Sequence, residues 1–158
     1  MALSSASLSS SLRDRWLPAD DGPYADSATA SGDAFAAAVS SWFANATAGP
    51  YPCSTATARR GQLASSAGAA LAAGRAEAAG ALLATALVAY MAGQAFGPGV
   101  ASPPLGPALA QTALTGVFAD LDTATSDRAD RMAQAVWALA LTTIVVFPPV
   151  ISPPAPVS

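Results

Sequence analysis

The chain has 158 residues, of which 53% are hydrophobic and only 11% are charged, whereas about 25% of the residues of an ordinary soluble domain are charged. Its length fits one domain, and its low charge predicts burial against partners or lipid. The net charge is −3, Lys and His are absent, and Arg59-Arg60 is a lone basic doublet, so we expect no nucleic-acid partner. Without His, there can be no Ser-His-Asp or Cys-His catalytic site and no His-bearing zinc site.

The first predicted element is a docking helix within residues 1–17. Leu8, Leu12 and Trp16 recur at every fourth position, which places them on one face of a helix that must end before Pro18. The sequence leaves open whether this face packs on its own domain or on another subunit. Residues 18–32 have the composition of a linker.

A helical domain is predicted for residues 33–141. Asp33 can cap its first helix, which we expect to end near Gly49-Pro50. The Ala-rich stretch 56–96 predicts two helices, separated around the segment "AGRAEAAG". No repeat of 20–50 residues is evident that would predict a solenoid.

Pro107 opens the next helix, because a proline in the first turn loses no intrahelical hydrogen bond. After a turn, Thr125 or Ser126 can cap the last helix. The buried face of the helix that follows Pro107 is predicted to consist of Leu114, Val117, Phe118 and Leu121.

Residues 142–158 predict a strand followed by a Pro-rich arm, since the run "TTIVVF" is rich in β-branched residues. An isolated strand cannot satisfy its own backbone groups. We therefore expect Ile144, Val145, Val146 and Phe147 to add to the sheet of a neighbouring chain. The alternative is a terminus that packs on its own chain or is disordered. The fold class predicted overall is mainly α, with five or six helices, one short C-terminal strand and an extended arm.

Candidate chemical sites are few. Asp120, Asp122, Asp127 and Asp130 lie close together in sequence, and we expect them to serve as turn and helix-cap residues. An enzyme that uses paired aspartates is an alternative that would need two of them to converge. Cys53 is predicted to be a plain thiol in a Pro-rich loop. We expect no catalytic residue, cofactor, metal or small-molecule substrate.

Two apolar stretches raise a membrane alternative. Residues 78–96 are uncharged and nearly long enough to span a bilayer, and residues 132–147 form a second apolar run. The first stretch is largely Ala and Gly, and no cluster of basic residues flanks it. We favour closely packed buried helices over a membrane-active, holin-like protein with two spanning helices.

Four segments carry a family resemblance: "MALSSASLSSSLRDRW", "LVAYMAGQAF", "VASPPLGPALAQTALTGVF" and "VWALALTTIVVFPP". Their order resembles the pattern found in virion structural proteins of tailed bacteriophages and related contractile particles. In that group a Trp is expected after the tyrosine, where this chain has Met91.

The resemblance implies a structural, non-enzymatic protein of the virion, made in the host cytoplasm and placed at the neck, tail, baseplate or capsid. The partners it implies are other copies of the chain and other virion proteins. The residues that we expect at the interfaces are Leu8, Leu12, Trp16, Ile144, Val145, Val146 and Phe147.

Overall fold

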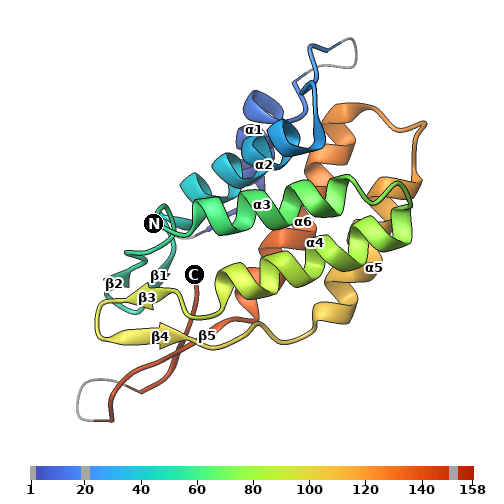
Figure 1. Ribbon diagram of the computed structural model, residues 1–158. Helices are drawn as coiled ribbons and strands as arrows, with labels where there is room; N and C mark the ends of the chain where they lie inside the picture. The colour runs from blue at the N-terminus through green and yellow to red at the C-terminus, as the bar shows by residue number, and fades with distance from the viewer. Residues whose placement is uncertain (1–2, 19–21, 150–152) are drawn as a thin grey trace.

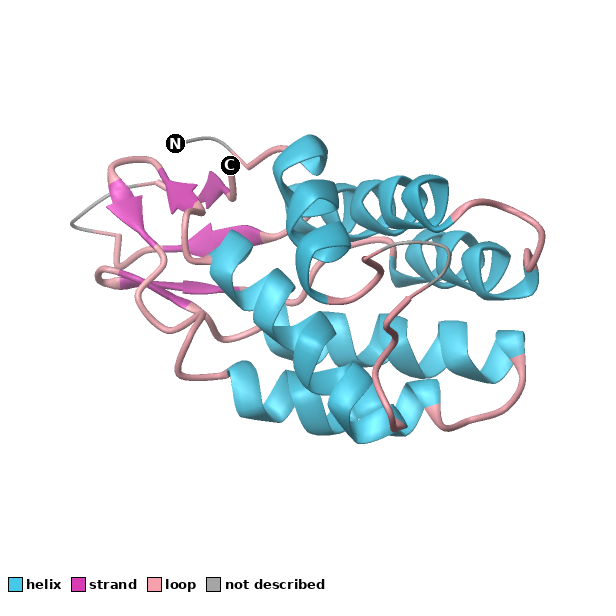
Figure 2. Ribbon diagram, turned by 90° about the horizontal axis from the view of Figure 1, so that it is seen from above, coloured by secondary structure: helices cyan, strands magenta, loops and turns pink. Residues whose placement is uncertain are grey.

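The computed structural model describes residues 3–18, 22–149 and 153–158. Helices fill most of the molecule, and the strands gather at one end of them (Figures 1 and 2). The predicted mainly α fold is confirmed. The helices in the described residues are α1 (Ser5–Arg15), α2 (Ala28–Phe43), α3 (Arg60–Leu71), α4 (Ala76–Met91), α5 (Pro107–Ala119) and α6 (Thr125–Leu141). The strands are β1 (Thr47–Ala48), β2 (Tyr51–Pro52), β3 (Ala95–Phe96), β4 (Gly99–Ala101), β5 (Ile144–Val146) and β6 (Ala155–Pro156).

The chain contains an internal repeat of one helix, a β-hairpin and a second helix. Helix α4 begins and ends 48 residues after α2, and β3 lies 48 residues after β1. Both hairpins turn at a Gly-Pro pair whose glycine has a left-handed backbone conformation, with φ of 59° at Gly49 and 58° at Gly97. We call residues 28–71 unit 1 and residues 76–119 unit 2. The expectation that no repeat is present is therefore wrong, because Ala-rich helices carry little side-chain pattern to compare.

A third unit is assembled from the two ends of the chain. Helix α6 and the β5–β6 hairpin supply its first half, and α1, which packs on α6, supplies its second helix. One backbone hydrogen bond recurs at the base of each hairpin, where an N–H at or just after the end of the second strand donates to the carbonyl just before the first strand. These bonds are Cys53 to Ala46 (2.9 Å), Ala101 to Gln94 (2.9 Å) and Val157 to Thr143 (3.0 Å).

The three hairpins join into one ring. The residue that donates to the next hairpin is a serine in every case, and the carbonyl that accepts belongs to the first residue of the next hairpin's first strand. The three N–H···O bonds are Ser54 to Ala95 (2.9 Å), Ser102 to Ile144 (2.8 Å) and Ser158 to Thr47 (2.9 Å). The C-terminal segment therefore closes the strand ring against unit 1, and the C-terminus lies beside the strands (Figure 2).

Within unit 1 and within unit 2, the two helices cross at close range. A Cβ atom on Gly32 of α2 would lie 2.5 Å from the backbone nitrogen of Gly68 on α3. The equivalent Gly80 of α4 would place a Cβ atom 2.7 Å from the backbone nitrogen of Thr115 on α5. These glycines are therefore needed because the two backbones leave no room for a side chain.

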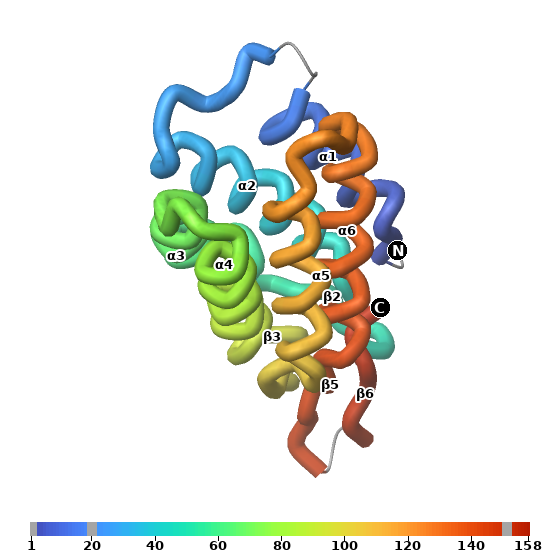
Figure 3. The backbone as a smooth tube through the Cα atoms, turned by 90° about the vertical axis from the view of Figure 1, so that its right-hand side faces the viewer, coloured from blue at the N-terminus to red at the C-terminus, as the bar shows by residue number. Residues whose placement is uncertain are grey.

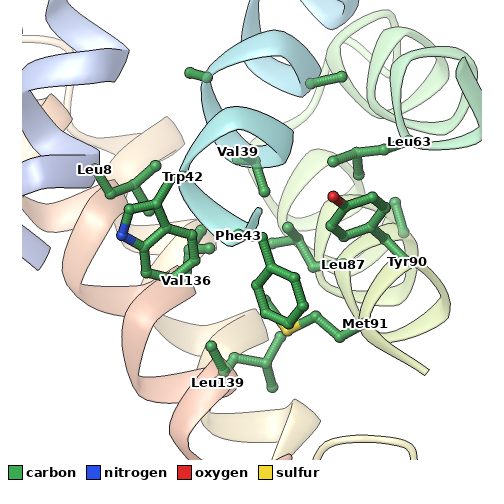
Figure 4. Close-up of a cluster of buried hydrophobic side chains, with 14 of the residues drawn as sticks. Leu8, Val39, Trp42, Phe43, Leu63, Leu87, Tyr90, Met91, Val136 and Leu139 are labelled. Atoms are coloured by element: carbon green, nitrogen blue, oxygen red, sulfur yellow. The ribbon is translucent and has the colours of Figure 1, made fainter. Parts of the chain in front are cut away.

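Buried hydrophobic side chains pack between the helices (Figure 4). Phe43 is fully buried, and its ring meets the edges of Tyr90 at 5.9 Å and Phe96 at 6.3 Å between centroids. The Tyr90 hydroxyl donates to the carbonyl of Ala56 at 2.9 Å, so the buried phenol is satisfied. Aromatic residues from units 1 and 2 therefore fix both units to the same centre.

Several helix boundaries differ from the sequence-based expectation. Helix α2 begins at Ala28 instead of Asp33, because the Ser27 hydroxyl accepts a hydrogen bond from the Ala30 N–H and caps it. It ends at Phe43, before the first hairpin. The predicted break between α3 and α4 and the start at Pro107 are confirmed. Leu121 was expected to be buried but lies beyond α5 and is exposed.

Candidate interaction surface

The predicted docking face of α1 lies inside its own domain. Leu8 and Leu12 are fully buried, and Trp16 is nearly so. The Trp16 indole N–H donates to the Ser31 hydroxyl at 2.7 Å, and its ring meets the edge of Phe35. The expectation that Leu8, Leu12 and Trp16 form an interface is therefore corrected: α1 completes unit 3, so its apolar face is used within the chain.

The predicted assembly strand is also paired within the chain. Strand β5 lies between β4 and β6, with Val145 opposite both Ala101 and Ala155. Val145 and Phe147 are buried. The expectation that 142–147 joins a neighbour's sheet, with a free arm beyond it, is therefore wrong. The strand finds the partner edges that it needs in β4 and in the returning C-terminal segment; residues 150–152 of the arm lie outside the described residues.

Two of the predicted interface residues do face outward. Ile144 and Val146 are on the outer face of β5, and Val146 lies opposite Val100 of β4. Val100 and Val146 are each 53% exposed. We call Val100, Ile144 and Val146 the sheet patch. Val100 was missed from the sequence because a two-strand hairpin was not expected there.

A groove runs between α5 and α6, with a volume of about 590 Å³. Figure 3 shows these two helices side by side. Small residues such as Ala113, Gly116 and Ala138 form much of its lining, and Leu105 and Leu109 stand at its rim. Leu109 is 79% exposed. The sequence held a signal for this surface: α5 has no charged residue and carries Leu109 on a different face from the buried Leu114 and Val117.

The charge distribution sets this part of the molecule apart. Residues 78–119 and 132–158 contain no charged side chain. Of the residues that line the groove only Arg131 is charged, and its guanidinium is bound to the Asp120 carboxylate at 2.7 Å. The groove and the sheet patch are therefore made of uncharged residues, apart from one cation that is already paired.

Two residues of the aspartate cluster are held in separate contacts. Asp120 binds Arg131 and accepts a hydrogen bond from Thr123, whereas Asp130 binds Arg13 and the Ser9 hydroxyl. The Thr123 hydroxyl and Arg131 hold the pKa of Asp120 below its usual value. The two carboxylates are thus used in separate structural contacts, and no group of three or more candidate metal ligands lies together in the part of the chain that the structure describes.

The buried ionisable groups near the first hairpin are kept neutral. Burial raises the pKa of the Cys53 thiol, and burial likewise raises the pKa of the Tyr90 phenol far above its usual value. The Cys53 thiol lies 3.7 Å from the Gln94 amide oxygen, which also accepts from the Thr55 hydroxyl at 2.6 Å. These contacts join the first and second hairpins, and they assign Cys53 to the junction of two units.

Comparison with family models, curated proteins and solved structures finds no match to this chain. Within residues 3–18, 22–149 and 153–158, no helix is both long enough and apolar enough to cross a bilayer.

Proposed function

We propose that this chain is a non-enzymatic structural component of a tailed-phage virion, at the neck, tail, baseplate or capsid. It assembles through repeated contacts with other copies of itself and with other virion proteins. The phage assignment rests on the resemblance of the four segments given above, whereas the assembly role rests on the surface.

The observation that carries the assembly role is the uncharged surface formed by the sheet patch and the α5–α6 groove. Large aliphatic side chains remain exposed there, namely Val100, Val146, Leu105 and Leu109. The centre of a protein–protein interface is typically depleted of charged residues, and contiguous exposed apolar surface commonly marks an interaction site. This surface is built on a closed strand ring and two packed helices.

Self-association tests the assembly role directly. Light scattering after size-exclusion chromatography is expected to show an oligomer for the full chain. Val100→Lys combined with Val146→Glu keeps a favourable cross-strand pair but places charge on the sheet patch, and it should yield monomers. Leu82→Lys, at an exposed position of α4, is the matched control and should stay oligomeric. A chain that is monomeric at every concentration up to its solubility limit would contradict self-assembly.

The virion assignment has its own test. Particles produced from the genome that encodes the chain are expected to contain it in a fixed ratio to the other structural proteins, as measured by quantitative mass spectrometry. Purified particles that lack the chain would contradict the assignment, whatever its oligomeric state.

A further inference from the structure

The three-unit architecture creates three equivalent seams between units: α1 with α2, α3 with α4, and α5 with α6. In each seam the first helix of the next unit, α2, α4 or α6, ends at the strand ring. The last carbonyl groups of a helix lack intrahelical donors and carry partial negative charge. Each seam therefore presents the same requirement for a hydrogen-bond donor.

Two seams meet this requirement with a side chain that reaches several carbonyls. In the first, the Asn45 amide donates to the carbonyls of Ser41 (3.1 Å) and Trp42 (3.4 Å). In the second, Arg59 lies at the N-cap position of α3 and spans the seam. Its guanidinium donates to the α4 carbonyls of Ala89 (2.9 Å), Tyr90 (3.1 Å) and Ala92.

In the third seam, the described side chains include none that reaches several of these carbonyls. The N-cap residue of α5, which corresponds to Arg59, is Gly106, with φ of 84°. An arginine could adopt this φ only with strain. At the end of α6 the Thr142 hydroxyl donates to the Leu139 carbonyl at 2.7 Å, and the Thr142 N–H is directed to Leu139 and Ala140 instead of Ala138. The groove lies beside Ala138, Leu139 and Thr142.

We propose that the α5–α6 groove binds an arginine side chain of a protein partner. The guanidinium takes the place at the Ala138 and Leu141 carbonyls that Arg59 takes at Ala89 and Ala92, whereas the Leu139 carbonyl already accepts from the Thr142 N–H and hydroxyl. The aliphatic part of the partner's arginine, and the apolar residues next to it in the partner, pack on Leu105, Leu109 and Ala113 of this chain. This inference rests on the proposed assembly function and names the chemistry of one partner contact.

Charge and shape both favour this occupant. A cation at a helix C-terminus interacts favourably with the helix dipole, and a planar guanidinium can bind several carbonyls at once, as Arg59 does. Arg131 lies about two turns away along α6 and is held by Asp120, so it does not reach the same carbonyls. A carboxylate ligand would meet only partial negative charge at the end of α6.

The test is an NMR titration of the ¹⁵N-labelled full chain with the peptide acetyl-Ala-Leu-Arg-Leu-Ala-amide. Amide shifts are expected at Leu109, Ala138, Leu139 and Thr142. The matched peptide carries citrulline in place of arginine, which keeps the shape and removes the charge. Because charge-assisted hydrogen bonds are lost, it should bind about tenfold more weakly or worse.

A pair of variants locates the site. Ala113→Trp fills the groove and should abolish the arginine-dependent shifts, whereas Gln111→Trp, at an exposed position of α5 outside the groove lining, should preserve them. Equal binding of the two peptides, shifts elsewhere, or no shifts up to the peptide's solubility limit would overturn the inference. Self-association is measured on the same sample. If the chain oligomerises but does not bind the arginine peptide, the arginine site is refuted and the proposed assembly function still stands.

Discussion

The α3–α4 and α5–α6 seams join the same elements in the same order, yet one is filled and the other is hollow. Arg59 spans the first and donates to three carbonyls of α4. Gly106 occupies the matching position of the second, where a groove of about 590 Å³ remains. The comparison teaches that, in these two seams, an arginine at the helix N-cap accompanies a filled seam and a glycine at the same position accompanies a hollow one.

The charged residues of the two seams are placed differently. In the filled seam, Arg59 is itself the side chain that donates to the α4 carbonyls. In the hollow seam, the charged residues of α6 all lie in its first half, up to Arg131, and Arg131 is held by Asp120. The rest of the groove lining is uncharged, so open space and uncharged walls coincide beyond Arg131, which suits a docking surface.

The largest expected effect comes from breaking the core that both seams share. Phe43→Ala removes a fully buried ring that contacts Tyr90 and Phe96, and it should lower the free energy of unfolding by about 3–5 kcal/mol. Urea denaturation measures this change. Leu82→Ala, at a half-exposed position of α4, should change stability by less than about 0.5 kcal/mol. Similar effects of the two substitutions would contradict the described core.

Substitutions at glycine test the tight helix crossings inside the units. Gly32→Ala places a methyl group against the backbone of Gly68 and should cost about 1–3 kcal/mol. Gly61→Ala lies on α3 with no atom within 4 Å of the added Cβ, and it should be neutral or stabilise by up to about 1 kcal/mol. Thermal unfolding of both variants gives the comparison, and a Gly32→Ala protein as stable as the parent would show that α2 and α3 do not cross there.

Removing the cap from the filled seam makes it resemble the hollow one. Arg59→Ala deletes the donors to Ala89, Tyr90 and Ala92 and should destabilise the chain by about 1–3 kcal/mol. The adjacent Arg60 is exposed, so Arg60→Ala is the matched control and should change little. If chemical denaturation gave equal values for the two arginines, Arg59 would not be acting as a cap.

The smallest effect concerns the Asp120–Arg131 pair, in which Arg131 lines the groove. Because the folded-state pKa of Asp120 is lowered, its ionised form adds stability above its unfolded-state pKa, and this contribution is lost as the pH falls through the folded-state pKa. Asp120→Asn should therefore be less stable than the parent at pH 7, with the gap closing below the usual aspartate pKa of about 3.9. Asp122→Asn is the control. A gap that persists unchanged at low pH would rule out this linkage.

The sequence was sufficient for the helices because their signals are local. Pro107 and the Gly-containing break after α3 mark helix ends wherever they occur. The strands could not be predicted in the same way, because pairs such as Ala95-Phe96 and Ala155-Pro156 have no strand pattern by themselves. They are extended because hydrogen bonds from residues far away in the chain pair them.

The same reason explains the corrected interface. Leu8, Trp16 and Val145 have the side chains of docking residues, and each is buried, but by other parts of their own chain. Periodicity predicts that an apolar face will be covered and does not say by what. The groove depends on Gly106 lying where Arg59 lies in the preceding unit, and this relation appears only once the repeat is seen in three dimensions.

The central claim is that three equivalent units close in a ring, with the third made from both ends of the chain. A circular permutant tests it most directly: residue 158 is joined to residue 1 by a short Gly/Ser linker, and the chain is opened between Ala73 and Gly74, in the turn between α3 and α4. All three units are then continuous. We expect the parent's circular dichroism spectrum, cooperative unfolding and a Tm within a few degrees of the parent. A second permutant, opened within α2 between Val39 and Ser40, is the control and should be strongly destabilised. If the first permutant were unfolded and no more stable than this control, the three-unit ring would be contradicted.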